Sequence, residues 1–165
     1  TPVAGETFIV GTQGNGIFTS NVELPKTSLN ASDDKYYIET IKCDGNADAV
    51  TSLKLGTSKV AGSYTFKPGV EGDYTLTFYG AAWKGAATTA NMFITGGGAI
   101  NGADMVTLDL QANDGVSGNA PYTVTFGDKD FYTVTITGAT ADTMIQFSTV
   151  DCAKCRVIFT GINVN

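Results

Sequence analysis

The stretch at residues 73–83, DYTLTFYGAAW, constrains the fold more than any other part of this chain. Apolar and polar side chains alternate along it, which is the period of two that a strand with one buried face requires. The two predicted faces carry Tyr74, Leu76 and Phe78 on one side, and Thr75, Thr77 and Tyr79 on the other. We therefore expect a central strand of an antiparallel sheet, which ends in small residues just before the only tryptophan, Trp83.

The same alternation recurs in short segments along the whole chain. Turn sequences rich in Gly, Asn and Asp separate these segments, and the chain has 20 glycines but only 16% charged residues. About eleven or twelve short strands of this kind are typical of an all-β fold, a two-sheet antiparallel β-sandwich. A chain of 165 residues can bury a core as one such domain, spanning residues 1–165.

The predicted strands can be placed from the alternation and from the turns between them. In chain order they span residues 7–11, 16–24, 36–43, 49–56, 63–68, 73–83, 90–95, 105–111, 122–126, 131–137, 143–150 and 156–164. The strands at 122–126 and 131–137 flank Gly-Asp-Lys-Asp, a four-residue connection that predicts a β-hairpin.

The charge and the missing residue types exclude several functions. Ten Lys and Arg against 16 Asp and Glu give a net charge of −6, which disfavours nucleic acid and anionic lipid as partners. The chain has no histidine, the commonest general base and metal ligand. No apolar run approaches the roughly 20 residues of a membrane-spanning helix. The pairs Asp33 and Asp34, and Asp128 and Asp130, each lie within one loop rather than across a cleft, so we expect no enzyme.

The three cysteines are Cys43, Cys152 and Cys155. The spacing of the last two, C-A-K-C, also occurs in redox and zinc sites. Here it lies between two predicted strands rather than at the start of a helix, and the chain offers no histidine to complete a zinc shell. We therefore expect either a local disulfide or two ordinary thiols in a turn.

Five segments together resemble a group of β-sandwich modules from exported and surface proteins of Gram-negative anaerobes. They are LKLGTSKVAGSYTF at residues 53–66, YTLTFYGAAWKG at 74–85, the glycines at 96–98, YTVTFGDKDFYTVTITG at 122–138 and RVIFTGINV at 156–164. These modules are similar to galactose-binding-like, jelly-roll carbohydrate-binding domains. The resemblance implies a jelly-roll sandwich that binds a glycan without catalysis, in a shallow rim or groove lined by aromatic rings.

The resemblance also implies a structural calcium ion. In related jelly rolls, acidic residues before the final I-x-V commonly help to hold that ion, whereas this chain has Thr160 and Gly161 there. Glu6 is the candidate oxygen ligand, and a solvated side chain near the terminus is its alternative role.

The candidate ligand-binding residues combine aromatic rings with amide, carboxylate and cationic groups, which is the chemistry that recognises sugars. They are Trp83, Lys84, Tyr36, Tyr37, Asn113, Asp114 and Asn119. Each has a structural alternative. A lone tryptophan in a sandwich of this size is more often a core residue than a ligand contact, one tyrosine of the pair would be buried by strand alternation, and Asn113-Asp114-Gly115 is a turn sequence in its own right.

Two functions follow as hypotheses. The first is a non-catalytic carbohydrate-binding module of a cell-surface or secreted protein. The alternative is a structural or adhesive surface module that contacts a protein partner or spaces other domains. Because the chain starts at Thr1-Pro2-Val3 with no leader sequence, we expect a mature or trimmed form of an exported protein.

Overall fold

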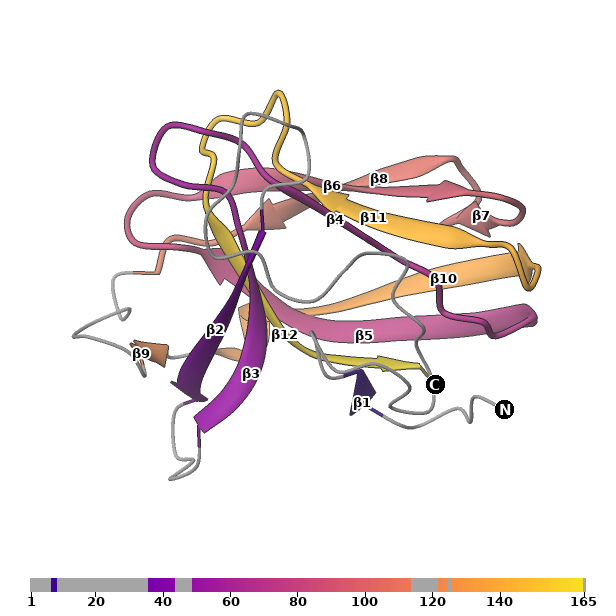
Figure 1. Cartoon of the computed structure of the whole chain (residues 1–165), viewed down its shortest axis with the longest axis horizontal. Helices are drawn as coiled ribbons and strands as arrows, with labels where there is room; N and C mark the ends of the chain where they lie inside the picture. The colour runs from indigo at the N-terminus through magenta and orange to yellow at the C-terminus, as the bar shows by residue number, and fades with distance from the viewer. Residues whose placement is uncertain (1–6, 9–35, 44–48, 114–121, 125, 165) are drawn as a thin grey trace.

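The computed structural model describes residues 7–8, 36–43, 49–113, 122–124 and 126–164, which are almost entirely β (Figure 1). The strands are β1 (Thr7–Phe8), β2 (Tyr36–Cys43), β3 (Ala49–Leu55), β4 (Ser63–Phe66), β5 (Gly72–Ala82), β6 (Thr88–Thr95), β7 (Ala99–Ile100), β8 (Met105–Leu110), β9 (Tyr122–Val124), β10 (Phe131–Ala139), β11 (Met144–Ser148) and β12 (Val157–Val164). The described residues contain one helical element, the 3₁₀ turn η1 (Asp128–Asp130). They include no helix that is long and apolar enough to cross a membrane.

The strands form two facing sheets. The larger sheet has the order β7-β10-β5-β12-β3-β2-β9, with β1 also paired to β12, and the smaller has the order β4-β11-β6-β8. Figure 1 shows the smaller sheet lying over β10, β5 and β12 of the larger one. The predicted all-β, two-sheet sandwich is therefore confirmed.

Successive strands cross between the sheets. The strands from β3 to β8 alternate between the larger and the smaller sheet, and so do those from β10 to β12. This is the connectivity expected of a jelly roll. The pairing is antiparallel throughout the described ladders, except that β2 and β9 run parallel.

The β5 strand is central, as its alternation predicts. It pairs with β10 on one edge and β12 on the other. Tyr74, Leu76 and Phe78 are buried, while Tyr79 on the opposite face is 38% exposed. The core side chains of both sheets meet around Phe78, Phe147 and Phe159, whose ring centroids lie 4.4 to 5.7 Å apart.

The hairpin predicted between residues 122–126 and 131–137 is wrong. The β9 strand pairs with β2 at the far edge of the larger sheet, whereas β10 pairs with β5 and β7. The turn Asp128–Asp130 is therefore a connection across the sheet, and the core-facing pattern of β10 selects β5 as its partner. The predicted strand at 16–24 lies outside the described residues.

Cys152 and Cys155 are free thiols, so of the two alternatives for this pair the ordinary thiols are correct and the local disulfide is wrong. Nothing is described of the Cys43 side chain.

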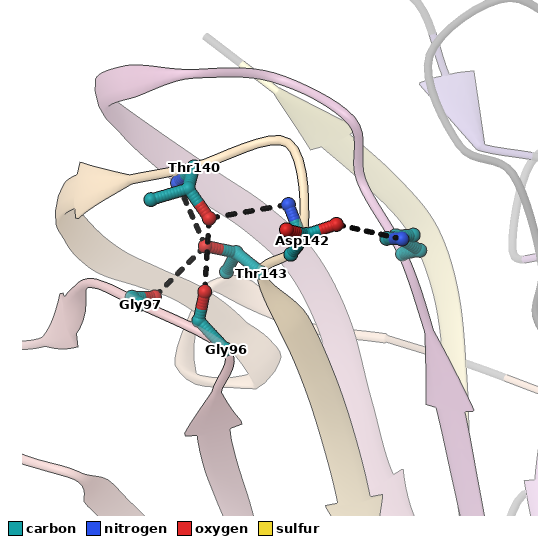
Figure 2. A network of polar contacts seen from close by, with 6 residues as sticks. Gly96, Gly97, Thr140, Asp142 and Thr143 are labelled. Carbon is teal, nitrogen blue, oxygen red and sulfur yellow. Dashed lines mark hydrogen bonds and ion pairs between the residues drawn. The ribbon is translucent and has the colours of Figure 1, made fainter.

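At the end of the sandwich where β11 begins, two turns are joined by threonine hydroxyls (Figure 2). Thr140 Oγ1 donates to the Gly96 carbonyl at 2.9 Å, and Thr143 Oγ1 donates to the Gly97 carbonyl at 2.8 Å. A Cβ on Gly96 would lie 2.3 Å from the Asp142 carbonyl oxygen, so only glycine fits there. The loops that form the candidate site lie at the opposite end of β11.

Candidate functional site

Three loops lie at the end of the sandwich where β11 ends (Figure 1). Residues of these loops line a pocket of about 200 Å³. The loops are the β3–β4, β5–β6 and β11–β12 connections. We call this the rim pocket and define it by Thr57, Ser58, Trp83, Lys84, Lys154 and Arg156, which line it with Ala82, Gly85, Ala86 and Cys155. The structure thus brings the predicted residues Trp83 and Lys84 into one concave site.

The Trp83 ring is not the exposed platform that stacking on a sugar requires. Only 3% of the residue is exposed, and the Lys54 ammonium nitrogen lies 4.9 Å from the centroid of the ring. The backbone N–H of Trp83 donates to the Arg156 carbonyl at 3.2 Å, which holds the residue against the β11–β12 loop. Of the two alternatives for Trp83, the structure shows the buried one, and a role for Trp83 in ligand contact stays a prediction.

Lys84 and Asn113 lie at the same end of the sandwich. Lys84 is exposed and has a φ of 57°, a left-handed conformation that non-glycine residues rarely adopt. The Asn113 N–H donates to the Gly85 carbonyl at 3.2 Å, and the Asn113 side chain is buried. Asn113 therefore fastens the loop that carries Lys84.

For the remaining predicted residues the structure describes no side chain. Tyr36 and Tyr37 lie in β2, where their backbones pair with Leu55 and Lys54 of β3. Asp114, Asn119 and Glu6 lie outside the described residues, so the calcium expectation on Glu6 stays a prediction. Within the described residues no group of three or more Cys, Asp or Glu is arranged to hold a metal ion.

A second concavity, of about 350 Å³, lies on the outer face of the smaller sheet. We call it the face hollow, and its lining residues are Ser63, Asn91, Phe93, Gln146, Ser148, Val150 and Asp151. The strand register places its lining residues from β4, β6 and β11 in two cross-strand rows, which continue into neighbouring residues of the sheet. One row is Thr65, Gln146, Phe93 and Met105, and the other is Ser63, Ser148, Asn91 and Thr107.

Hydrogen bonds hold the polar groups of the face hollow in place. Gln146 Nε2 donates to Thr65 Oγ1 at 3.1 Å, and Asn91 Oδ1 accepts from Thr107 Oγ1 at 2.8 Å. A side-chain amide has two N–H donors and a carbonyl oxygen with two lone pairs. Both amides therefore keep capacity for a ligand after these bonds are made. Asp151 is the one charged residue among the described lining.

Sequence reasoning missed the face hollow although a usable signal was present. In TANMFIT the buried residues Met92 and Ile94 alternate with Asn91 and Phe93, and in MIQFS the buried Ile145 and Phe147 flank Gln146. The alternation places Asn91, Phe93 and Gln146 on the outer face. Only the pairing of β6 with β11 shows that they are neighbours.

The comparisons with known proteins give little beyond this geometry. No protein-family model matches the chain, and no curated protein matches it in sequence. A Paenibacillus sp. cycloisomaltooligosaccharide glucanotransferase complexed with cycloisomaltoheptaose is 13% identical over 96% of this chain, with a TM-score of 0.45. This chain spans only 18% of that enzyme. TmCBM61 in complex with β-1,4-galactotriose is 7% identical over 82% of this chain and 90% of its own, with a TM-score of 0.34.

Proposed function

We propose that this protein is a non-catalytic carbohydrate-binding domain and that the face hollow holds the glycan. The observation that carries the proposal is the juxtaposition of Phe93 with the amides of Asn91 and Gln146 on one open surface. A sugar presents an apolar ring face and a border of hydroxyl groups, and these match an aromatic ring flanked by amides and hydroxyls. The geometry of the hollow carries this assignment, since neither structural likeness is close enough to transfer a function.

The polarity of the face hollow favours a neutral polyhydroxylated ligand. Apart from Asp151, its described lining offers uncharged donors and acceptors, and the neighbouring strands repeat them at a spacing of about 4.8 Å. Such a surface suits a chain of sugar units lying across β4, β11 and β6.

Affinity gel electrophoresis and calorimetry against a panel of neutral plant and host polysaccharides test this proposal. We expect at least one polysaccharide to bind, and Gln146→Ala and Phe93→Ala each to weaken its affinity roughly tenfold, which corresponds to about 1.4 kcal/mol. Thr133→Ala is the matched control, because Thr133 is exposed on the other sheet. We expect this variant to bind with the affinity of the parent.

Two results would overturn the assignment. If the folded domain binds no polysaccharide of the panel, the function is wrong. If a polysaccharide binds equally well to the parent, Gln146→Ala and Phe93→Ala, with unchanged melting temperatures, the site is wrong.

One observation favours a second candidate function, a structural or adhesive module that contacts a protein partner. Tyr79 and Phe131 are 38% and 46% exposed on the outer face of the larger sheet, and their ring centroids lie 5.1 Å apart. Phe126 packs beside Tyr79 at 5.6 Å. Exposed aromatic clusters of this kind are enriched at protein interfaces. Phe131→Ser would abolish such a contact and leave polysaccharide binding unchanged.

A further inference from the structure

The rim pocket concentrates positive charge in an acidic protein. Lys84, Lys154 and Arg156 line it, and its described lining contains no Asp or Glu. The chain as a whole carries a net charge of −6. Three cations around one small concavity repel one another, so the cluster favours an anion between them.

Two of these cations have no carboxylate partner in the described part of the chain. The Lys154 ammonium and the half-buried Arg156 guanidinium make no ion pair with a described residue. Lys67, at the other end of the sandwich, differs because it pairs with Asp142 at 3.4 Å. A guanidinium carries five N–H donors in a planar fork that matches an oxyanion.

The walls of the pocket are fixed by hydrogen bonds before any ligand arrives. The Thr57 N–H donates to the Val60 carbonyl at 2.8 Å and closes the β3–β4 turn. The Lys154 N–H donates to Thr88 Oγ1 at 3.0 Å, which fastens the β11–β12 loop to β6. A binding site that is already ordered loses little conformational freedom on binding.

We propose that the rim pocket binds an oxyanion, the carboxylate or sulfate group of a small acidic ligand. Lys154 and Arg156 supply the charge, and Ser58, which also lines the pocket, carries a hydroxyl that can donate a neutral hydrogen bond. The volume of about 200 Å³ equals roughly seven water molecules at about 30 Å³ each, which suits one charged group or a single acidic sugar unit. The same β11–β12 loop also contributes Val150 and Asp151 to the face hollow.

The indole N–H signal of Trp83 gives a direct readout, because the chain has one tryptophan and this residue lines the pocket. We would titrate ¹⁵N-labelled protein with sodium sulfate, glucuronate and glucose, using sodium chloride at matched ionic strength as the control. We expect saturable shifts with sulfate or glucuronate, at a Kd on the order of 1 mM, and none with glucose or chloride. Saturation by glucuronate alone would identify an acidic sugar, and saturation by both a general oxyanion site.

Charge-removing variants locate the binding. Arg156→Gln and Lys154→Gln should each lower the affinity for the anion at least tenfold. Arg156→Lys keeps the charge but loses the planar fork of N–H donors, so its affinity should lie between those of the parent and Arg156→Gln. Lys129→Gln removes one exposed cation from η1, outside the pocket, and should bind as the parent does. Lys154 is exposed, so its variant retains the fold even if Arg156→Gln does not.

Three outcomes would overturn the proposal: no saturable shift with any anion, equal shifts with matched chloride, or the same loss of affinity in Lys129→Gln and Lys154→Gln. The result is separate from the glycan assignment, because Gln146→Ala and Phe93→Ala alter the face hollow alone. They should leave the anion titration unchanged.

Discussion

The Lys54 ammonium nitrogen lies 4.9 Å from the centroid of the Trp83 ring. This distance is within the range of a cation–π contact, and it places a positive charge over an indole of which only 3% is exposed. Trp83 therefore combines burial with a position in the wall of the rim pocket.

The first prediction concerns Trp83 fluorescence. The buried indole should emit at short wavelength and be quenched weakly by acrylamide, and neutral polysaccharide should leave its emission unchanged because Trp83 does not line the face hollow. Lys54→Met removes the charge over the ring and should alter the emission intensity without unfolding the protein. A red-shifted, strongly quenched emission from the parent protein would contradict the burial of Trp83.

The second prediction concerns Gly80 in the central strand. A Cβ at this position would lie 2.9 Å from two ring carbons of Phe159 and 3.3 Å from a methyl carbon of Leu110. Gly80→Ala should therefore lower the free energy of unfolding by about 1–3 kcal/mol, as overpacking of a core does. Gly127→Ala is the matched control, since a Cβ there meets no atom closer than 3.9 Å. Chemical denaturation measures both, and equal stability of the two variants would contradict this packing.

Much of the fold could be predicted because alternation is a local property. The bounds predicted for β2 agree with the structure, and the residues predicted to face inward in β5, Tyr74, Leu76 and Phe78, are buried. The partner of β9 could not be predicted. Residues 122–126 and 131–137 are close in sequence, which favours a hairpin between them, but β9 pairs with β2, and β10 pairs with β5 through its core contacts. The two-residue strand β7 is too short to show any period.

The candidate site was predicted only in part, for a similar reason. Trp83 and Lys84 are adjacent in sequence, so their shared loop was evident, but residue type could not show that Lys54 of another strand covers the ring. Phe93 and Gln146 are 53 positions apart (146 − 93), and they become neighbours only through the pairing of β6 with β11. Residue types indicate which groups could bind a sugar, whereas the sheet register determines which of them meet.

The third prediction concerns the Thr143 hydroxyl in the network of Figure 2. It donates to the Gly97 carbonyl and accepts from the Thr140 N–H, both at 2.8 Å, and only 1% of the residue is exposed. Thr143→Val keeps the shape but leaves both partners unsatisfied, so we expect a loss of about 2 kcal/mol in the free energy of unfolding.

Thr133→Val is the control for this experiment, because the Thr133 side chain is exposed on β10 and β-branched residues suit a strand. We expect its stability to stay within about 0.5 kcal/mol of the parent. If thermal melting shows Thr143→Val to be as stable as Thr133→Val, the turn network does not contribute to stability.

The last prediction concerns alkaline pH. Burial raises the pKa of Tyr74 from 10.0 to about 12. Burial, and then the charges of Asp130 and Asp109, raise the pKa of Tyr132 to about 12 as well. Between pH 10 and 12 the folded protein therefore binds more protons than the unfolded chain. Stability should be complete below pH 10 and fall as pH rises towards 12, by up to about 1.4 kcal/mol per pH unit for Tyr74 alone.

Tyr74→Phe isolates that contribution. The Tyr74 hydroxyl is buried without a hydrogen-bond partner among the described residues, so its removal should leave stability at pH 7 unchanged or slightly higher. Above pH 10 the variant should lose stability less steeply than the parent, with the remaining slope due to groups such as Tyr132. Urea unfolding at pH 7, 10 and 11 measures this difference. Parallel pH profiles for parent and variant would show that Tyr74 does not titrate as a buried group.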